Sequence, residues 1–204
     1  NKNNTNQQST ARYYFAEYQF QKRFKDFLTL TLGATDSYSE VASQLYGNHT
    51  GNNFAVFAQG DIKYKKFSFS LGGRIEKNRI DTTRDDFKPV IRTGINYHLA
   101  KETYMRASFG QGYRFPSIAE KYISTQVSSV SIYPNDSLNP ETGWSAEFGI
   151  MQGIKIAEWN GYIDVAVFQT EYKEMMEFAF GQWGAAVPPN YGIGFKSRNI
   201  GDTR

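Results

Sequence analysis

The sequence of 204 residues contains no cysteine. This absence excludes a disulfide framework, a thiolate metal site and a cysteine nucleophile. Histidine is scarce too, because His49 and His98 are the two in the chain and lie too far apart in sequence to predict a pair of metal ligands. We therefore expect no cofactor, no resident metal and no catalytic residue.

Long apolar runs are also absent, and no stretch approaches the roughly 18 to 20 apolar residues of a membrane-spanning helix. This leaves a soluble protein or a β-barrel. Residues 1–10 are polar and have neither the basic start nor the apolar middle of a secretory signal. We expect either that the protein is not exported or that the chain begins inside a longer one.

No charge of one sign dominates. The 23 basic and 20 acidic residues give a net charge of +3 and are spread along the chain. Proteins that bind nucleic acid usually gather their basic residues into a stripe or patch. Nucleic acid is therefore not an expected partner.

Aromatic residues, in contrast, are abundant: 16 Phe and 14 Tyr stand in a chain whose mean hydropathy is -0.57. This mixture suits strands with one apolar and one polar face. Residues 67–76 show the pattern most clearly, with Phe67, Phe69, Leu71 and Ile75 alternating with Ser68, Ser70, Arg74 and Glu76.

The same alternation recurs along the chain in stretches of about ten residues, the length that a tilted strand needs to cross a bilayer. The stretches are 14–20, 28–32, 54–64, 91–99, 105–113, 144–150 and 161–167. The strand that begins near Gly161 is expected to run on toward Phe180, and a last one to start near Phe195. We count about nine consecutive strands, and because closed bacterial barrels have an even number, we expect further strands outside this chain.

Connections between the strands alternate between short and long. Short ones are expected at 22–26, 65–66, 100–101 and 153–158, and long polar ones at 39–52, 80–87, 114–140 and 181–194. Outer-membrane barrels have short periplasmic turns and longer extracellular loops, whereas a soluble sandwich has no such order. The predicted fold class is all-β, a partial antiparallel transmembrane β-barrel.

Aromatic residues gather toward the strand ends, where the interfacial girdles of a barrel lie. The expected girdle residues are Tyr13, Tyr14, Phe24, Phe27, Tyr64, Phe67, Tyr97, Tyr104, Tyr113 and Trp159.

The stretch from Gly110 to Tyr122, GQGYRFPSIAEKY, resembles the barrel motif of TonB-dependent outer-membrane receptors. In that motif a glycine-rich strand runs into an Arg-x-Pro-Ser-x-x-Glu loop. Residues 133–149 are similar to the Leu-x-Pro-Glu and Glu-x-Gly pattern of the same family, although Pro134-Asn135 reverses the usual Asn-Pro order. The resemblance covers nearly the whole chain, including the AVFAQ strand at 55–59 and residues 199–204.

The resemblance implies a receptor in the bacterial cell outer membrane that imports a scarce ligand, such as a ferric siderophore, haem, cobalamin or an oligosaccharide. It implies that residues 1–204 form part of the barrel domain, and that an N-terminal plug and the remaining strands lie outside them. Expected partners are outer-membrane lipid, the small-molecule or oligosaccharide ligand, and the TonB complex, which would act through the N-terminal region that is not seen here.

Ligand contacts are expected from loop residues with binding-type side chains: Tyr113, Arg114, Tyr122, Tyr133 and Trp183. For Arg114 the competing expectation is a structural pair with Glu120 that pins the loop to the barrel rim.

Two other functions stay open. One is a soluble all-β binding module, such as a carbohydrate-binding sandwich, which would need its apolar rows to face each other across a core. The other is an outer-membrane enzyme with a centre at Ser117 or His98, although no G-x-S-x-G elbow is present.

Overall fold

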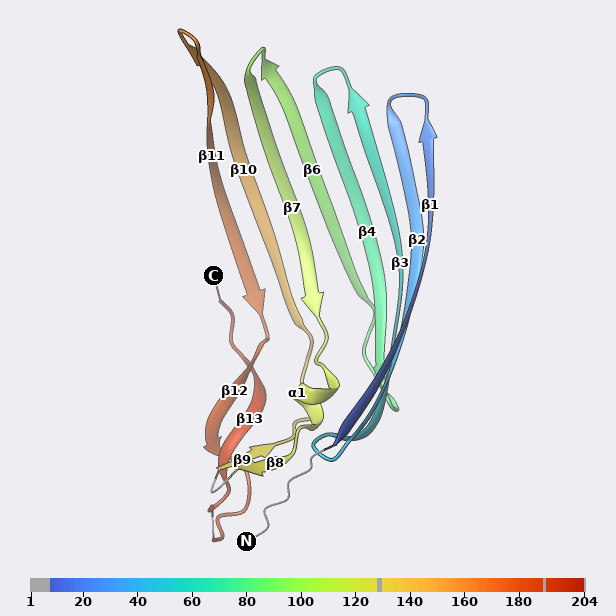
Figure 1. The fold of residues 1–204 in the computed structure, drawn as a ribbon, viewed down its shortest axis with the longest axis vertical. Coiled ribbons are helices and arrows are strands. Elements are labelled where there is room, and N and C mark those ends of the chain that lie inside the picture. The colour runs from blue at the N-terminus through green and yellow to red at the C-terminus, as the bar shows by residue number, and fades with distance from the viewer. Residues whose placement is uncertain (1–7, 128–129, 189, 204) are drawn as a thin grey trace.

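The structure is a computed structural model, and it describes residues 8–127, 130–188 and 190–203. Eight long antiparallel strands form the main sheet in the order β1–β2–β3–β4–β6–β7–β10–β11, with the short β5 beside β4 (Figure 1). Their bounds are β1 Ser9–Phe24, β2 Leu28–Ser43, β3 Gly47–Tyr64, β4 Phe67–Ile80, β5 Thr83–Arg84, β6 Lys88–Ala100, β7 Thr103–Arg114, β10 Glu141–Ile156 and β11 Trp159–Lys173. Within the described residues β1 and β11 are the two edge strands and do not pair with each other, so the sheet is an open wall; the outer edge of β11 has one isolated bridge, from Tyr172 to Thr203.

A smaller sheet and one short helix lie beyond one end of the wall (Figure 1). The sheet has the order β12–β13–β9–β8, and β9 and β13 are its parallel pair. The bounds are α1 Ile118–Tyr122, β8 Thr125–Val127, β9 Val130–Tyr133, β12 Met175–Gln182 and β13 Ile193–Ile200. Among the described residues, no helix is long and apolar enough to cross a membrane.

The strand register places most apolar side chains on one face of the wall and most polar side chains on the other. Cross-strand partners share a face, because they point to the same side of an antiparallel sheet. One row of partners is apolar in all eight strands: Phe24, Leu28, Ile62, Phe69, Ile95, Ala107, Phe148 and Val167. A row on the opposite face is polar except at Gly94 and Phe168: Arg23, Thr29, Asp61, Ser70, Gly94, Ser108, Glu147 and Phe168.

The apolar face lacks a covering layer within the described residues. Leu71 is 50% exposed and Val167 is 65% exposed. The buried hydrophobic side chains of the described part of the chain are Ala55, Ile80, Leu138 and Met176, too few for the core between two stacked sheets. This arrangement supports the barrel prediction and gives no support to the soluble sandwich.

Aromatic pairs mark two levels on the apolar face. Phe67 stacks on Tyr97 at 4.4 Å near the short turns, and Tyr14 lies 6.4 Å from Tyr38 much farther along the strands. Ten residues of β1 separate Phe24 from Tyr14. At about 3.3 Å per residue and a tilt of about 40°, this span is about 25 Å, the height of the apolar band of outer-membrane barrels.

Two predictions, one for a connection and one for a strand, differ from the structure. The expected long loop at 39–52 is wrong, because β2 continues to Ser43 and β3 begins at Gly47. In these residues apolar and polar side chains no longer alternate, but the backbone hydrogen bonds between β2 and β3 continue. A strand that has passed the apolar band needs no apolar side chains. The other long connections lie where they were predicted, and the one at 114–140 contains α1, β8 and β9.

The predicted continuous strand from Gly161 toward Phe180 is also wrong. Glu174 has a left-handed backbone conformation with φ of 57°, and there the chain leaves β11 and enters β12 of the smaller sheet. The side-chain amide of Asn199 donates to the Glu174 carbonyl at 2.8 Å and to the Asn139 carbonyl at 2.9 Å. This pair of bonds holds the bend against the end of β13.

Candidate functional site

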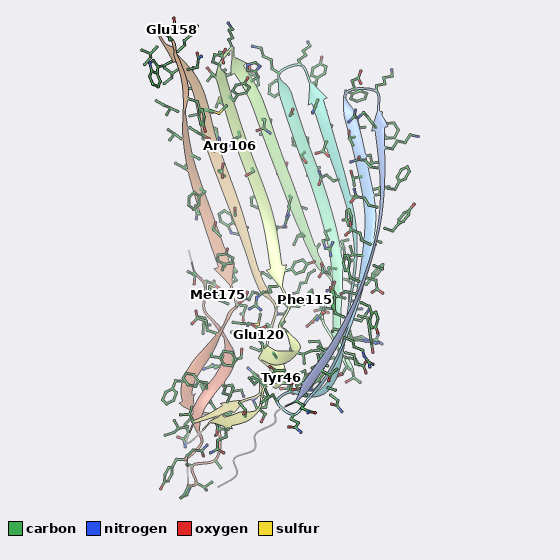
Figure 2. All side chains as sticks on the ribbon, in the orientation of Figure 1. Tyr46, Arg106, Phe115, Glu120, Glu158 and Met175 are labelled. Atoms are coloured by element: carbon green, nitrogen blue, oxygen red, sulfur yellow. The ribbon has the colours of Figure 1, made fainter. Side chains whose placement is uncertain are left out.

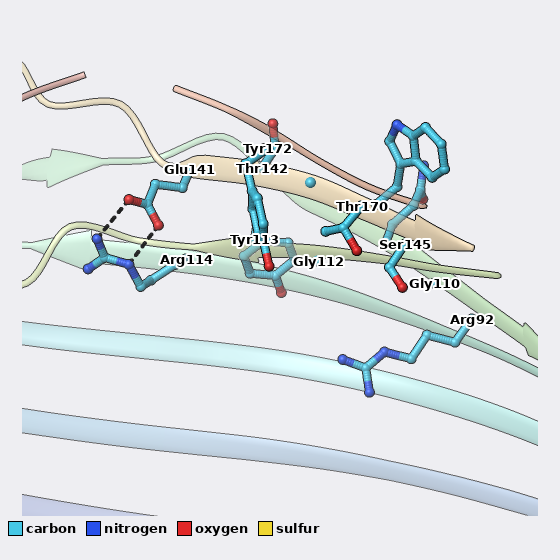
Figure 3. Close-up of a pocket in the computed structure, with 13 residues that line it drawn as sticks. Arg92, Gly110, Gly112, Tyr113, Arg114, Glu141, Thr142, Ser145, Thr170 and Tyr172 are labelled. Atoms are coloured by element: carbon cyan, nitrogen blue, oxygen red, sulfur yellow. Dashed lines mark hydrogen bonds and ion pairs between the residues drawn. The ribbon is translucent and has the colours of Figure 1, made fainter. Parts of the chain in front are cut away.

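The polar face is hollowed where β7 and β10 approach the loops (Figure 3). Three glycines, Gly110, Gly112 and Gly143, leave this part of the wall without side chains, and Gly112 is the direct partner of Gly143. The hollow has a volume of about 490 Å³. Its lining is Arg92, Gly110, Gln111, Gly112, Tyr113, Arg114, Glu141, Thr142, Gly143, Trp144, Ser145, Thr170 and Tyr172.

Arg114 holds the rim of this hollow together. Its Nη1 lies 2.8 and 2.9 Å from the two carboxylate oxygens of Glu120, and its Nε and Nη2 lie 2.8 and 2.9 Å from those of Glu141. A guanidinium can bind two carboxylates in this way because its five donors are fixed in one plane. Glu141 also accepts the Met176 backbone N–H at 2.6 Å. One side chain therefore joins the end of β7, the start of α1, the start of β10 and the start of β12.

The expected pairing of Arg114 with Glu120 is confirmed, and Glu141 is a second partner that the sequence did not indicate. Ser117 and Glu120 add a capping box at the start of α1: the Ser117 hydroxyl accepts the Glu120 N–H, and the Glu120 carboxylate accepts the Ser117 N–H at 2.8 Å. Burial opposes ionisation of Glu120, but the bonds from Ser117 and Arg114 outweigh it and hold the pKa of Glu120 below its usual range.

This pKa predicts how acid acts on the loop. A carboxylate whose pKa is lowered by folding stabilises the fold above its ordinary pKa, and this stability is lost as the pH falls through the lower value. We expect the amide protection of α1 to be retained at pH 5 and reduced at pH 3, measured by hydrogen exchange of the protein in detergent. The Glu120→Gln variant should lose most of this change; an equal decrease in that variant would assign the acid effect to another group.

Tyr113 points to the polar face and not to the lipid girdle in which we expected it. Its hydroxyl donates to the Glu76 carboxylate at 2.5 Å, and that carboxylate also accepts Arg74 Nε at 2.7 Å and Asn53 Nδ2 at 2.7 Å. The Tyr113 ring meets Phe115 edge to face at 5.3 Å. These bonds connect the end of β7 to β3 and β4 across the start of β6.

The other expected ligand contacts lie apart from this hollow. Tyr122 stacks on His49 with ring centroids 3.8 Å apart. Tyr133 belongs to β9 and packs against Gly184. Trp183 follows β12, where its Nε1 donates to the Ala179 carbonyl at 3.1 Å and its ring lies beneath Arg198. Tyr113 and Arg114 thus share the hollow, whereas Tyr133 and Trp183 lie at the smaller sheet.

All five residues nevertheless lie at the loop-bearing end of the wall. Figure 2 shows Phe115, Glu120, Tyr46 and Met175 at this end, and Glu158 at the opposite one. An ion-pair group lies between them on the polar face, where Arg106 Nε is 2.9 Å from Glu147 and Nη1 is 2.8 Å from Asp164. Sequence reasoning missed this group because its members lie on three different strands.

The two suggested enzymatic residues do not form a catalytic arrangement. The Ser117 hydroxyl bonds to Glu120 at the start of α1, whereas His98 stacks on Tyr104 at 4.5 Å beside one of the short turns, at the other end of the strands. In the part of the chain that the structure describes, no three His, Cys, Asp or Glu side chains are grouped to hold a metal ion.

A single layer with one apolar face, one polar face and a rim of loops defines the chain as a wall segment of an outer-membrane-type β-barrel. The family model described as "TonB dependent receptor-like, beta-barrel" matches residues 1–204. The chain therefore belongs to this family, whose members are transport receptors of the bacterial outer membrane.

Known proteins of the family resemble the chain in sequence and in fold. The hemoglobin and hemoglobin-haptoglobin-binding protein of Haemophilus ducreyi is 31% identical over 88 residues, which cover 43% of this chain and 9% of that protein. The hemophore receptor HasR of Serratia marcescens, solved in complex with its hemophore HasA and heme, superposes with a TM-score of 0.81 at 17% identity, covering 96% of this chain and 38% of that one. The siderophore receptor PirA of Pseudomonas aeruginosa gives 0.80 at 14% identity over the same shares. The chain thus spans less than two fifths of these structures, and their likeness shows the fold.

Proposed function

We propose that the chain forms part of the barrel wall of an outer-membrane receptor that imports a scarce ligand with energy delivered through TonB. The observation that carries this proposal is the division of the wall into a largely apolar and a largely polar face, because a wall of this kind separates lipid from a wet lumen. An N-terminal plug and further strands would complete the barrel. The protein would then be a transporter and not an enzyme.

The names of the similar proteins favour an iron compound, haem or a ferric siderophore, over cobalamin or an oligosaccharide. We place the ligand on the polar face at the loop-bearing end, where Tyr113 and Arg114 border the hollow. In this proposal Arg114 shapes the rim through its two carboxylate partners, and Tyr122, Tyr133 and Trp183 meet the ligand farther out.

The proposal is tested by measuring binding of haem, a ferric siderophore, cobalamin and an oligosaccharide to the protein purified from outer membranes. Uptake of the compound that binds is then measured in cells with and without TonB. The expected result is binding of one class and uptake that requires TonB. Recovery of the native protein from the soluble fraction, or uptake that is equal without TonB, would overturn the proposal.

Filling the hollow should weaken binding of the ligand. A Cβ added at Gly112 meets nothing within 4 Å, so Gly112→Phe introduces a ring at the hollow with no clash at its Cβ. We expect affinity for the ligand to fall about tenfold, which corresponds to about 1.4 kcal/mol. Gly60 is the matched control, because it is equally free of neighbours but lies on the apolar face as the partner of Leu71. Equal affinity of Gly112→Phe and Gly60→Phe would move the ligand away from this hollow.

A further inference from the structure

His49 connects three segments at the loop-bearing end. Its Nε2 lies 2.6 Å from the Tyr46 carbonyl oxygen, in the turn between β2 and β3. Its Nδ1 lies 2.7 Å from Oδ2 of Asp81, the first residue after β4. Its ring stacks on Tyr122 of α1 at 3.8 Å with an interplanar angle of 13°. The side chain is only 16% exposed, so water does not replace these contacts easily.

The partners of the two His49 ring nitrogens determine how many protons the ring must carry to form both hydrogen bonds. A carbonyl oxygen accepts hydrogen bonds and cannot donate one, and an ionised carboxylate also only accepts. Both bonds therefore form together when both ring nitrogens carry a proton, which is the imidazolium form of histidine. A neutral ring keeps one of the two bonds and turns a lone pair toward the other acceptor.

Asp81 is held in its ionised form by other contacts. Its Oδ1 accepts the Thr50 N–H at 2.8 Å. Burial opposes the charge, but the bonds from His49 and Thr50 outweigh it and keep the pKa of Asp81 below its usual range. The Asp81 carboxylate therefore acts as a hydrogen-bond acceptor toward the ring.

Helix α1 brings two further titratable residues, Tyr122 and Lys121, to this end of the wall. Tyr122 is the titratable group that α1 presents to the ring, and its pKa is raised by burial and by Asp81 and Asp136. It thus stays neutral at physiological pH, and its face attracts a cationic ring. Lys121, which precedes Tyr122 in the same helix, is buried. Tyr46 contacts the ring through its backbone carbonyl.

We propose that His49 is a proton-dependent clasp, which ties α1 and the β4–β6 connection to the β2–β3 turn when its ring is doubly protonated and loosens them as the pH rises. The loop attached to the clasp carries Glu120 and, through it, the rim contact of Arg114. Two backbone bonds join the same segments: Ser124 N–H donates to the Leu45 carbonyl at 2.9 Å, and Asp81 N–H donates to the Thr50 carbonyl at 2.8 Å. This device does not require a particular ligand, and it would regulate the access of any ligand from outside the cell.

The test is hydrogen exchange of residues 118–124 at pH 5.5 and pH 8 in the full-length protein, corrected for the intrinsic pH dependence of exchange. We expect protection about tenfold higher at pH 5.5, the effect of one charge-assisted bond. In the His49→Phe variant, which keeps a ring against Tyr122 but no donors, protection should be low at both values. Equal protection of the wild-type protein at both values would overturn the proposal.

Asp81→Asn gives the sharpest variant. A side-chain amide can accept the Thr50 N–H with its oxygen and donate to the neutral His49 ring with its nitrogen, so the clasp then forms without the extra proton. The expected pH dependence vanishes or reverses. His98→Phe is the control at the other end of the sheet, where the second histidine stacks on Tyr104, and it should leave the difference unchanged. Persistence of the wild-type difference in both Asp81→Asn and His49→Phe would assign it to another group and refute the clasp.

Discussion

Leu71→Arg is expected to destabilise the barrel by about 2–4 kcal/mol, the cost of an arginine that faces lipid near the middle of the membrane. Leu71 lies on the apolar face of the central strand β4, 50% exposed, between its partners Gly60 and Thr93. It stands four residues from Phe67, whose ring marks the level of the short turns. This places Leu71 about 10 Å inside the apolar band, too deep for an arginine to reach water easily.

Ser70→Arg is the matched control, one residue away on the opposite face. Ser70 has Asp61 as its cross-strand partner on one side and Gly94 on the other, so a new guanidinium finds a carboxylate and free space. Unfolding of both variants by denaturant in lipid vesicles measures the difference. We expect Ser70→Arg to lie within about 0.5 kcal/mol of the wild-type protein. Equal destabilisation of the two variants would contradict the assignment of the faces.

The fold could be predicted from the sequence because alternation with a period of two is local. Phe67 to Glu76 shows its two faces within ten residues, and such a pattern needs no knowledge of the neighbouring strands. The same reasoning failed where strand residues do not alternate between apolar and polar side chains, or where a strand ends without a change in that pattern. Strands β2 and β3 continue through residues 39–43 and 47–52, where the side chains are mostly polar or small, and their mutual backbone bonds hold them. At Glu174 the strand ends through a positive φ at a residue type that gives no warning of it.

The site was less predictable, because its contacts join residues that are distant in sequence. Arg114 and Glu120 are six residues apart in one motif, so their pairing could be expected, whereas Glu141 is brought in by the register of β7 with β10. His49 and Asp81 meet because the start of β3 lies beside the end of β4. The position of Tyr113 in the alternation predicts that it faces lipid, but its hydroxyl bonds to Glu76 on the polar face. It can do so because the pairing of β7 with β6 has already ended at Gly110.

Arg114→Met should cause the second large effect, a loss of about 2–3 kcal/mol in the stability of the rim. The substitution keeps an unbranched apolar stem but removes four charge-assisted bonds. It leaves Glu120 and Glu141 with side chains only 23% and 19% exposed and without their cation. The loss is smaller than for a fully buried pair because Arg114 itself is half exposed. Hydrogen exchange of residues 117–123 and of Met176 measures the opening, since the Met176 N–H is bound by Glu141.

Arg12→Met provides the comparison, because the Arg12–Glu40 pair is a single contact of 3.6 Å between two exposed side chains. Such pairs contribute about 0–1 kcal/mol, so this variant should change exchange little. Adding Glu120→Gln to Arg114→Met removes one of the two unpaired charges, and this should restore part of the protection of α1 while the Met176 amide stays exposed. If Arg114→Met opened the rim no more than Arg12→Met does, the Arg114 contacts would be surface pairs, and the join between β7, α1, β10 and β12 would have to depend on backbone bonds alone.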